Sequence, residues 1–420
     1  MNPTALLDLT TRLLQLALKF DQPADAVVSN FMRAHRELGP RERHTLAETT
    51  YTVLRQRLLL QHLAQSGSGP LERRLAALAW AGSDSFLRAA LAPHEQKWLA
   101  EVQALDRSAL PEKLRHNLPD WLAGALHEQL PDEQFWPLVQ SLSEAAPLDL
   151  RVNTFKAKRD EVVRALAEAG FEATPTPHSP WGLRLKGKPA LNKLPLFTRG
   201  DVEVQDEGSQ LLALLTDAKR GEMVVDFCAG AGGKTLALGA SMRNTGRLYA
   251  FDVSGHRLEA LKPRLARSGL SNVYPAQIAH ERDERIKRLA GKIDRVLVDA
   301  PCSGLGTLRR NPDLKWRQSP QSVQELQAKQ TAILAGAARL LKSGGRLVYA
   351  TCSLLPAENE RVAEAFGEAH AREFEVLPAQ ELLESAQVLG AADLVAGNFL
   401  RLWTHRHHTD GFFAAAWRRR

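Results

Sequence analysis

The three cysteines of this 420-residue chain lie where the sequence predicts the ends of buried strands. Cys302 lies in the turn Asp-Ala-Pro-Cys-Ser-Gly, and Cys352 lies in the turn Ala-Thr-Cys-Ser. Cys228 directly follows the apolar run 223–227. Open parallel sheets bind ligands at the carboxyl ends of their strands, so three cysteines in such places indicate a reactive site. A single free cysteine is more often a small buried hydrophobic residue, and this alternative weakens when all three share the pattern.

Two cysteines and one carboxylate suit a particular kind of nucleophilic catalysis. A thiolate that adds to carbon 6 of a cytosine turns the ring into an enamine, and carbon 5 can then take a methyl group from S-adenosyl-L-methionine. The reaction needs a cysteine of lowered pKa, a carboxylate near the ring nitrogen and a group that helps to resolve the adduct. Cys302, Cys352 and Asp299 supply these parts. Chemistry alone leaves open which cysteine attacks.

A glycine-rich loop, Cys-Ala-Gly-Ala-Gly-Gly-Lys, follows a predicted strand and precedes a predicted helix. A P-loop is excluded because Cys228 stands where its first glycine is required. A dinucleotide fingerprint fits Gly230 and Gly232 but has Thr235 at its third position. A loop for S-adenosyl-L-methionine fits, with Asp252 at the end of the next strand for the ribose. That acid would also serve a nicotinamide cofactor, so the loop alone predicts an adenosine cofactor, against the alternative of a tight structural turn.

The elements that must position these residues alternate from about residue 215 onward. Apolar runs predict strands, and amphipathic segments between them predict helices, which together favour a parallel sheet covered by helices. The predicted strands are 224–226, 247–252, 296–299 and 347–351, and the predicted helices are 235–242, 255–267 and 322–341. We therefore expect a Rossmann-like domain over residues 215–420.

The first half of the chain predicts two further domains. Residues 1–140 show wide apolar stripes at helical spacing and no strand-like alternation, which indicates a helical bundle. Residues 146–214 begin with the strand-like segment 148–153 and continue with a helix over 159–169, which indicates a small α/β module.

The charge of the chain hints at a polyanionic partner. Its net charge is +7, and residues 151–200 hold ten Lys/Arg against four Asp/Glu, a net +6. On charge alone, nucleic-acid binding and a solvated basic face are equally good explanations. If RNA binds there, Lys186 and Lys188 are among the side chains that we expect to contact phosphates.

Several features bear on where the protein acts. Three cysteines are too few for a disulfide framework and fit a reducing cytoplasm. We find no zinc-ligand spacing, no signal peptide and no apolar run of the ~18–20 residues that a membrane helix needs. We therefore expect a cytoplasmic protein, a monomer, with no metal and no membrane partner.

The chain resembles the NOL/NOP/Sun family of RNA cytosine-5 methyltransferases, and most closely its bacterial RsmB-like branch. The resemblance covers about residues 146–415 and is carried by the two cysteine turns, the glycine loop and the motifs Leu-Arg-Val-Asn (150–153), Gln-Asp-Glu-Gly-Ser-Gln (205–210), Glu-Asn-Glu (358–360) and Thr-Asp-Gly-Phe-Phe (409–413). Residues 1–140 resemble a NusB-like RNA-binding domain more loosely, through Gly-Pro-Arg-Glu-Arg (39–43). The module 146–214 is expected to be RRM-like.

The resemblance implies roles for individual residues. Cys352 would be the attacking thiolate, Cys302 would aid release of the product, and Asp299 would lie between cofactor and base. The substrate would be small-subunit 16S ribosomal RNA, and the methyl donor S-adenosyl-L-methionine. The cofactor would be held by Asp299, by His280 and Asp252, and by the glycine loop, which comprises Cys228, Ala229, Gly230, Ala231, Gly232, Gly233 and Lys234.

Two positions depart from the pattern of the family. The family loop usually reads Cys-Ala-Ala-Pro-Gly-Gly-Lys, whereas Gly230-Ala231 replaces Ala-Pro here. His280 stands where the family usually has an adenine-side acid; its ring can also hydrogen-bond, while Asp283 is nearby but out of register. An alternative to an enzyme is a catalytically idle RNA-binding factor for ribosome assembly, which the intact cysteines and loop disfavour. A nicotinamide-dependent oxidoreductase would have no use for the second cysteine.

Overall fold

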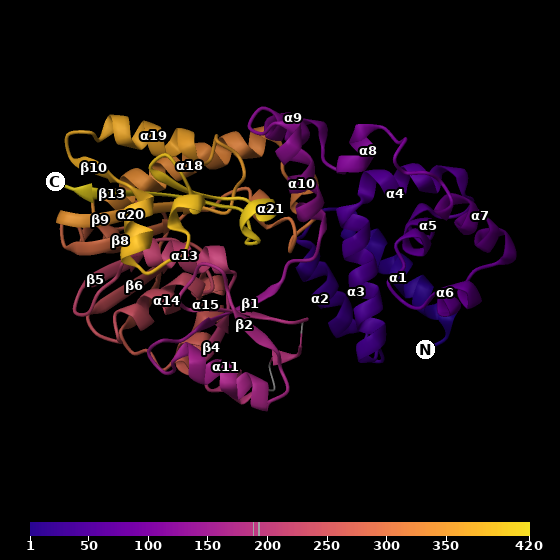
Figure 1. The fold of residues 1–420 in the computed structure, drawn as a ribbon, viewed down its shortest axis with the longest axis horizontal. Coiled ribbons are helices and arrows are strands. Elements are labelled where there is room, and N and C mark those ends of the chain that lie inside the picture. Colours follow the sequence, from indigo (N-terminus) through magenta and orange to yellow (C-terminus); the bar gives the residue numbers. More distant parts are fainter. Residues whose placement is uncertain (188, 192–193) are drawn as a thin grey trace. The chain divides into compact units, whose positions relative to one another are not determined.

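The computed structural model describes residues 1–187, 189–191 and 194–420 (Figure 1). Contacts between Cα atoms divide the chain into two compact units. One unit comprises Met1–Ala145 and Thr307–Pro320, and the other comprises Ala146–Gly306 and Gln321–Arg420. Across the described residues, no helix is both long and apolar enough to span a membrane.

The first unit is helical, as the sequence predicts. Its residues 1–145 form α1 (Pro3–Ala17), α2 (Ala24–Ala34), α3 (Pro40–Arg55), α4 (Arg57–Leu63), α5 (Leu71–Leu78), α6 (Asp84–Ala90), α7 (Pro93–Gln103), α8 (Glu112–His116), α9 (Asp120–His127) and α10 (Asp132–Ser143). Its core is built from the apolar stripes of these helices, with Leu7 and Leu14 of α1 packed with Val53 of α3 and Leu75 of α5.

Residues 307–320 belong to this helical unit although they lie far along the chain. They contain the short helix α17 (Leu314–Arg317). The indole of Trp316 donates to the carbonyl of Leu54 at 2.7 Å, and Nζ of Lys315 donates to the carbonyl of Arg55 at 2.8 Å. Burial, with a smaller effect of Arg55, lowers the pKa of Lys315 to about 7. The local sequence does not predict this placement because the partners lie about 260 positions away.

The second unit begins with a four-stranded antiparallel sheet. Its strands are β1 (Leu148–Val152), β2 (Ala173–Pro175), β3 (Gly182–Leu185) and β4 (Val202–Val204), in the order β2-β3-β1-β4. The helix α11 (Arg159–Glu168) packs Val162 and Leu166 against Leu150 and Leu183 of the sheet, and the short helix α12 is Pro195–Thr198. The predicted small α/β module is confirmed.

A larger mixed sheet follows. Parallel pairing joins β7 (Val273–Gln277), β6 (Arg247–Asp252), β5 (Met223–Asp226), β8 (Ile293–Asp299) and β9 (Leu341–Thr351) in that spatial order. The sheet then continues antiparallel through β13 (Phe412–Arg419), β12 (Phe399–Leu402) and β11 (Val395–Ala396), and β10 (Phe374–Leu377) pairs with β13. The expectation of a parallel sheet is therefore right for five strands and wrong for the C-terminal ones, because an apolar run does not reveal the direction of its partner.

Two hydrophobic clusters cover the two faces of this sheet. Val224 of β5 belongs to one cluster, and its neighbour Val225 belongs to the other. Successive side chains of a strand point to opposite faces of the sheet, which explains the difference. One face carries α13 (Glu207–Thr216), α14 (Gly233–Ser241), α15 (Gly255–Ser268) and α20 (Ala379–Ser385); the other carries α16 (Glu284–Lys287), α18 (Pro320–Ala338) and α19 (Glu360–Ala369). Figure 1 shows α18 and α19 on one side of the strands and α13, α14 and α15 on the other.

Candidate functional site

The two cysteine turns meet at the carboxyl edge of the large sheet. Strands β8 and β9 are parallel neighbours in which Asp299 pairs with Ala350, so both turns begin at the same level. The backbone N–H of Ala300 continues the pairing by donating to the carbonyl of Ala350 at 2.9 Å. As a result, Sγ of Cys302 lies 3.4 Å from Sγ of Cys352.

A buried carboxylate clamps these turns together. Glu358 accepts from the backbone N–H of Ser303 at 2.8 Å and from its hydroxyl at 2.5 Å, and it also accepts from the hydroxyl of Ser353. The side-chain amide of Gln330, on α18, donates to Oε1 of Glu358 at 3.0 Å, which is the oxygen that also accepts from the N–H of Ser303. Each serine directly follows a cysteine, and Glu358 is completely buried. The clamp therefore fixes the spacing of the two thiols.

A close backbone contact ties the same turns to the C-terminal motif. The N–H of Gly306 donates to the carbonyl of Cys352 at 2.8 Å, and the carbonyl of Gly306 accepts from the N–H of Gly411 at 2.8 Å. A Cβ atom at position 306 would lie 2.0 Å from the carbonyl oxygen of Gly411. Only glycine permits this approach.

The glycine loop crosses from β5 to α14 with two residues in the left-handed region. Gly230 has φ +54° and Gly232 has φ +83°, and a Cβ atom at Gly232 would meet Leu261 at 2.1 Å. The N–H of Gly230 donates to Asp252 at 2.8 Å, and the second oxygen of this carboxylate accepts from the N–H of Ser254 at 2.7 Å. A Cβ at Gly230 would have nothing within 4 Å, so the loop leaves open space at that residue.

Lys234 and Asp299 form an ion pair between the glycine loop and the first cysteine turn, with 2.7 Å between Nζ and Oδ2. Burial is the largest single effect and acts to lower the pKa of Lys234. The attraction and hydrogen bond of Asp299, together with the effects of Cys352 and Asp226, outweigh burial and raise that pKa. Beneath the pair, burial raises the pKa of Asp226 to about 7, although the hydroxyl of Thr235 donates to it at 2.7 Å.

The thiols differ in their surroundings. The hydrogen bond with Cys352 is the largest cause that raises the pKa of Cys302 well above its ordinary value, and burial adds to it. Burial also raises the pKa of Cys228. The raised pKa favours the thiol form of Cys302, and the two sulfur atoms lie within hydrogen-bonding distance of each other. The ammonium of Lys234 acts on the sulfur of Cys352.

His280 is the predicted site residue that the structure leaves apart from the others. It is exposed in the turn after β7, where its ring accepts from the N–H of Arg282 at 3.1 Å. Asp283 caps α16 and accepts from the backbone N–H groups of Ala279 and Arg285. Among the described residues, no hydrogen bond joins His280 to the glycine loop.

Sequence reasoning did not include Glu358 or Gln330 among the site residues. Glu358 stands in one of the motifs that carry the family resemblance, and that motif was the available signal. Gln330 gives no local signal because its role depends on which face of α18 meets the turns.

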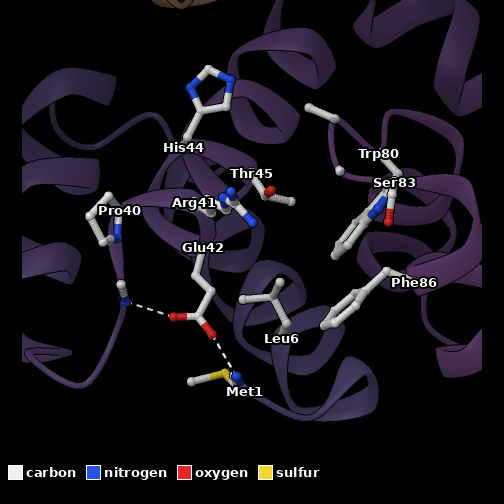
Figure 2. Close-up of a pocket in the computed structure, with 13 residues that line it drawn as sticks. Met1, Leu6, Pro40, Arg41, Glu42, His44, Thr45, Trp80, Ser83 and Phe86 are labelled. Atoms are coloured by element: carbon white, nitrogen blue, oxygen red, sulfur yellow. Dashed lines mark hydrogen bonds and ion pairs between the residues drawn. The ribbon is translucent and has the colours of Figure 1, made fainter.

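Two hollows lie outside the cysteine site. In the second unit, a groove of about 440 Å³ gathers four basic residues, one acid and two aromatic rings among its lining: Lys156, Lys158, Arg159, Arg243, Glu161, Phe155 and Trp181. The helical unit has a hollow of about 980 Å³ beside the start of α3. Figure 2 shows Trp80 and Phe86 on one side of it and Arg41 and His44 on the other.

Of the two lysines expected to contact phosphates, only Lys186 lies among the described residues. Lys186 pairs with Glu172 at 2.8 Å, and both are exposed. Lys188 lies outside the described residues. Within the described ranges, no group of three or more His, Cys, Asp or Glu is arranged to hold a metal ion.

The mixed sheet and the glycine loop at the carboxyl ends of its parallel strands are those of the Rossmann-like methyltransferases. Comparison with known proteins identifies the family within this class. Residues 213–418 match the family model of the 16S rRNA methyltransferases RsmB/F, and residues 118–192 match the ferredoxin-like domain of RsmF/B-like methyltransferases. The chain belongs to the RsmB/F methyltransferase family. Its cofactor is S-adenosyl-L-methionine.

Individual relatives agree with this assignment. The probable ribosomal RNA small subunit methyltransferase B of Synechocystis is 37% identical over 314 residues, which cover 74% of this chain and 69% of that protein. The ribosomal RNA small subunit methyltransferase B of Sodalis glossinidius is 36% identical over 63% of this chain, and the match spans only 60% of that protein. A methyltransferase homologue of Pyrococcus horikoshii has a solved structure with a TM-score of 0.62 and 31% identity, which covers 75% of this chain and 99% of that one.

Proposed function

We propose that this protein transfers a methyl group from S-adenosyl-L-methionine to carbon 5 of a cytosine in 16S ribosomal RNA through a covalent cysteine–cytosine adduct. The observation that carries the proposal is the 3.4 Å approach of the Cys302 and Cys352 thiols beside the Lys234–Asp299 pair. A methyltransferase that acts on a nitrogen or oxygen atom needs no such pair of thiols, whereas carbon 5 of cytosine must first be activated by a nucleophile.

The glycine loop and Asp252 would hold the cofactor, which supplies the methyl group when bound. Its amino-acid end needs close approach to the backbone, and the open space at Gly230 fits that need. The carboxylate of Asp252 is oriented by two backbone N–H groups and keeps lone pairs for ribose hydroxyls.

Cys352 is the attacking residue in this proposal. Its sulfur lies 3.4 Å from the sulfur of Cys302, and it interacts electrostatically with the ammonium of Lys234. The thiolate forms a bond to carbon 6 of the base, and Asp299, held by Lys234, faces the ring nitrogen. The reverse assignment, with Cys302 as the nucleophile, would require the thiol of raised pKa to ionise first.

Cys302 assists the release of the product. A solvent water accepts the proton of carbon 5, the electrons of that C–H bond form the double bond between carbons 5 and 6, and the carbon–sulfur electrons return to Cys352. The S–H group of Cys302 donates to that sulfur and stabilises it as a leaving thiolate. This hydrogen bond therefore assists the expulsion.

The basic groove would bind the RNA chain. Four cations against one acid attract phosphates, and the two aromatic rings can stack on bases. The helical unit, which we propose to be NusB-like, would add affinity through the exposed Arg41 and His44 at its hollow. We expect the protein to act as a monomer in the cytoplasm.

Bisulfite sequencing of 16S ribosomal RNA from a deletion strain tests the proposal. One cytosine should lose its protection, and a plasmid that carries the intact gene should restore it, whereas the Cys352→Ala gene should not. A full set of protected cytosines in the deletion strain would contradict the proposal and favour a catalytically idle assembly factor. Calorimetry should show binding of S-adenosyl-L-methionine and none of a nicotinamide dinucleotide.

A further inference from the structure

An arginine outside the glycine loop donates a hydrogen bond to a carbonyl group that lies between the two glycines of positive φ. Nη1 of Arg264, on α15, donates to the carbonyl of Ala231 at 2.7 Å. Gly230 and Gly232 on either side have positive φ, and neither carries a side chain that could restrict the peptides. The guanidinium is therefore a donor to a peptide carbonyl that lies between two residues without side chains.

The same guanidinium is anchored by the small antiparallel sheet. Nε and Nη2 of Arg264 both donate to one carboxylate oxygen of Glu203, a residue of β4, at 3.2 and 3.0 Å. Arg267 binds the second oxygen of Glu203. The side chain of Glu203 is only 5% exposed, so its position is set by these partners and by the sheet that carries it.

The buried guanidinium of Arg151 also interacts with the carboxylate of Glu203. Burial lowers the pKa of Arg151 to about 10, while the charge of Glu203 acts to raise it and that of Arg264 to lower it. Glu203 thus compensates the buried charge of Arg151 and the partly exposed charges of Arg264 and Arg267, and moving its carboxylate would leave the charge of Arg151 without compensation.

We propose that Arg264 is a positioning residue for the cofactor, and that Glu203 of the ferredoxin-like module sets its orientation. The proposal rests on the assignment of residues 228–234 as the cofactor loop. Without the hydrogen bond to Ala231, the two glycine peptides sample conformations that do not fit the ligand, and the apparent dissociation constant rises as the fitting fraction falls. Cofactor affinity therefore depends on Glu203, which precedes the segment 213–418 that matches the methyltransferase model.

The chain offers a matched control in Arg267. It binds the same carboxylate as Arg264, but it stacks on Phe197, with 4.2 Å between the guanidinium carbon and the ring centre. In the part of the chain that the structure describes, it makes no hydrogen bond to the glycine loop. Arg264→Gln removes the bond to Ala231 together with the bonds to Glu203, whereas Arg267→Gln removes a bond to Glu203 and the contact with Phe197 and leaves the bond to Ala231 in place. Thermal unfolding of both proteins identifies any general loss of structure.

The experiment measures binding of S-adenosyl-L-methionine to the full chain by calorimetry. We expect Arg264→Gln to weaken binding about tenfold, as loss of a hydrogen bond to a charged donor predicts, and Arg264→Lys to recover part of the loss. Glu203→Gln should weaken binding in the same direction, and Arg267→Gln should leave it within about twofold. Arg264→Gln should raise KM for the cofactor and leave kcat at saturation nearly unchanged, because it touches neither thiol.

Asp252→Ala separates the two ways in which the inference can fail. If Asp252→Ala abolishes binding while folded Arg264→Gln binds as the unmodified protein does, the inference is wrong and the loop assignment stands. If neither variant changes binding, both the inference about Arg264 and the assignment of the cofactor loop are wrong. Equal weakening by Arg264→Gln and Arg267→Gln would also overturn the inference, because it would indicate a structural role for the whole cluster.

Discussion

Ser303 and Ser353 donate their hydroxyl groups to the same carboxylate oxygen of Glu358, and each is the residue directly after one of the paired cysteines. The two turns thereby share one buried acceptor. The 3.4 Å spacing of the Cys302 and Cys352 thiols is a consequence of this shared bond as much as of the pairing of β8 with β9.

Replacing Glu358 by Gln should disturb that spacing. A glutamine has one acceptor oxygen where the carboxylate has two, and its NH2 group would face an N–H or hydroxyl donor. We expect a loss of stability of about 1–3 kcal/mol by denaturant unfolding and a larger proportional loss of turnover than of cofactor affinity. Unchanged turnover in the folded variant would show that the spacing does not depend on the clamp.

Cys352→Ala should abolish methyl transfer to RNA and leave cofactor binding nearly intact. The thiolate acts on the base and does not contact the methyl donor in the proposed reaction. Transfer of a radioactive methyl group and calorimetry measure the two properties separately. Substantial turnover by this variant would eliminate Cys352 as the nucleophile.

Cys302→Ala should stall the reaction after methylation, with RNA still bonded to Cys352. The missing S–H group can no longer stabilise the leaving thiolate, so a slow, denaturant-resistant protein–RNA band should form on a gel. The band should require S-adenosyl-L-methionine, and the double replacement should show none. A trapped band with Cys352→Ala and none with Cys302→Ala would mean that the two roles are reversed.

Charge reversal in the basic groove should weaken RNA binding. Lys158→Glu combined with Arg243→Glu removes two cations, and the dependence of log affinity on log salt should become shallower by about 0.7 for each phosphate that is no longer neutralised. Lys287→Glu is the control, because Lys287 is exposed on α16 and does not line the groove. Fluorescence anisotropy over a salt series measures the slope, and an unchanged slope in the double variant would exclude the groove.

Lys315 should make the stability of the helical unit depend on pH. Its pKa is about 7 in the folded chain against an ordinary value of 10.5, so the unfolded state binds more protons between these values. Stability should then rise with pH through this window, by at most about 1.4 kcal/mol per pH unit from this group. Denaturant unfolding at pH 7 and 9 should show a smaller rise for Lys315→Met, and an equal rise in both proteins would contradict the assignment.

The sequence predicts those parts of the protein that depend on short stretches of chain. Short apolar runs in the sequence indicate the strands that precede the glycine loop and the turns with Cys302 and Cys352. The parallel pairing of β8 with β9 then brings the two turns together. The direction of β13 could not be predicted, because its partner β9 is remote in sequence. The bond between Arg264 and Glu203 joins residues 61 positions apart and depends on how the helix α15 packs against the strand β4.

The return of residues 307–320 to the helical unit has a consequence for how this protein can be divided. The helical unit is completed by a piece of chain that begins directly after Gly306, so a cut near residue 146 removes ten helices but leaves α17 behind. Trp316 and Lys315 would then lose the carbonyl groups of Leu54 and Arg55 that satisfy them. Removal of residues 1–145 alone would therefore leave the segment 307–320 without the helices that it packs against. A shortened protein would need changes in this segment as well.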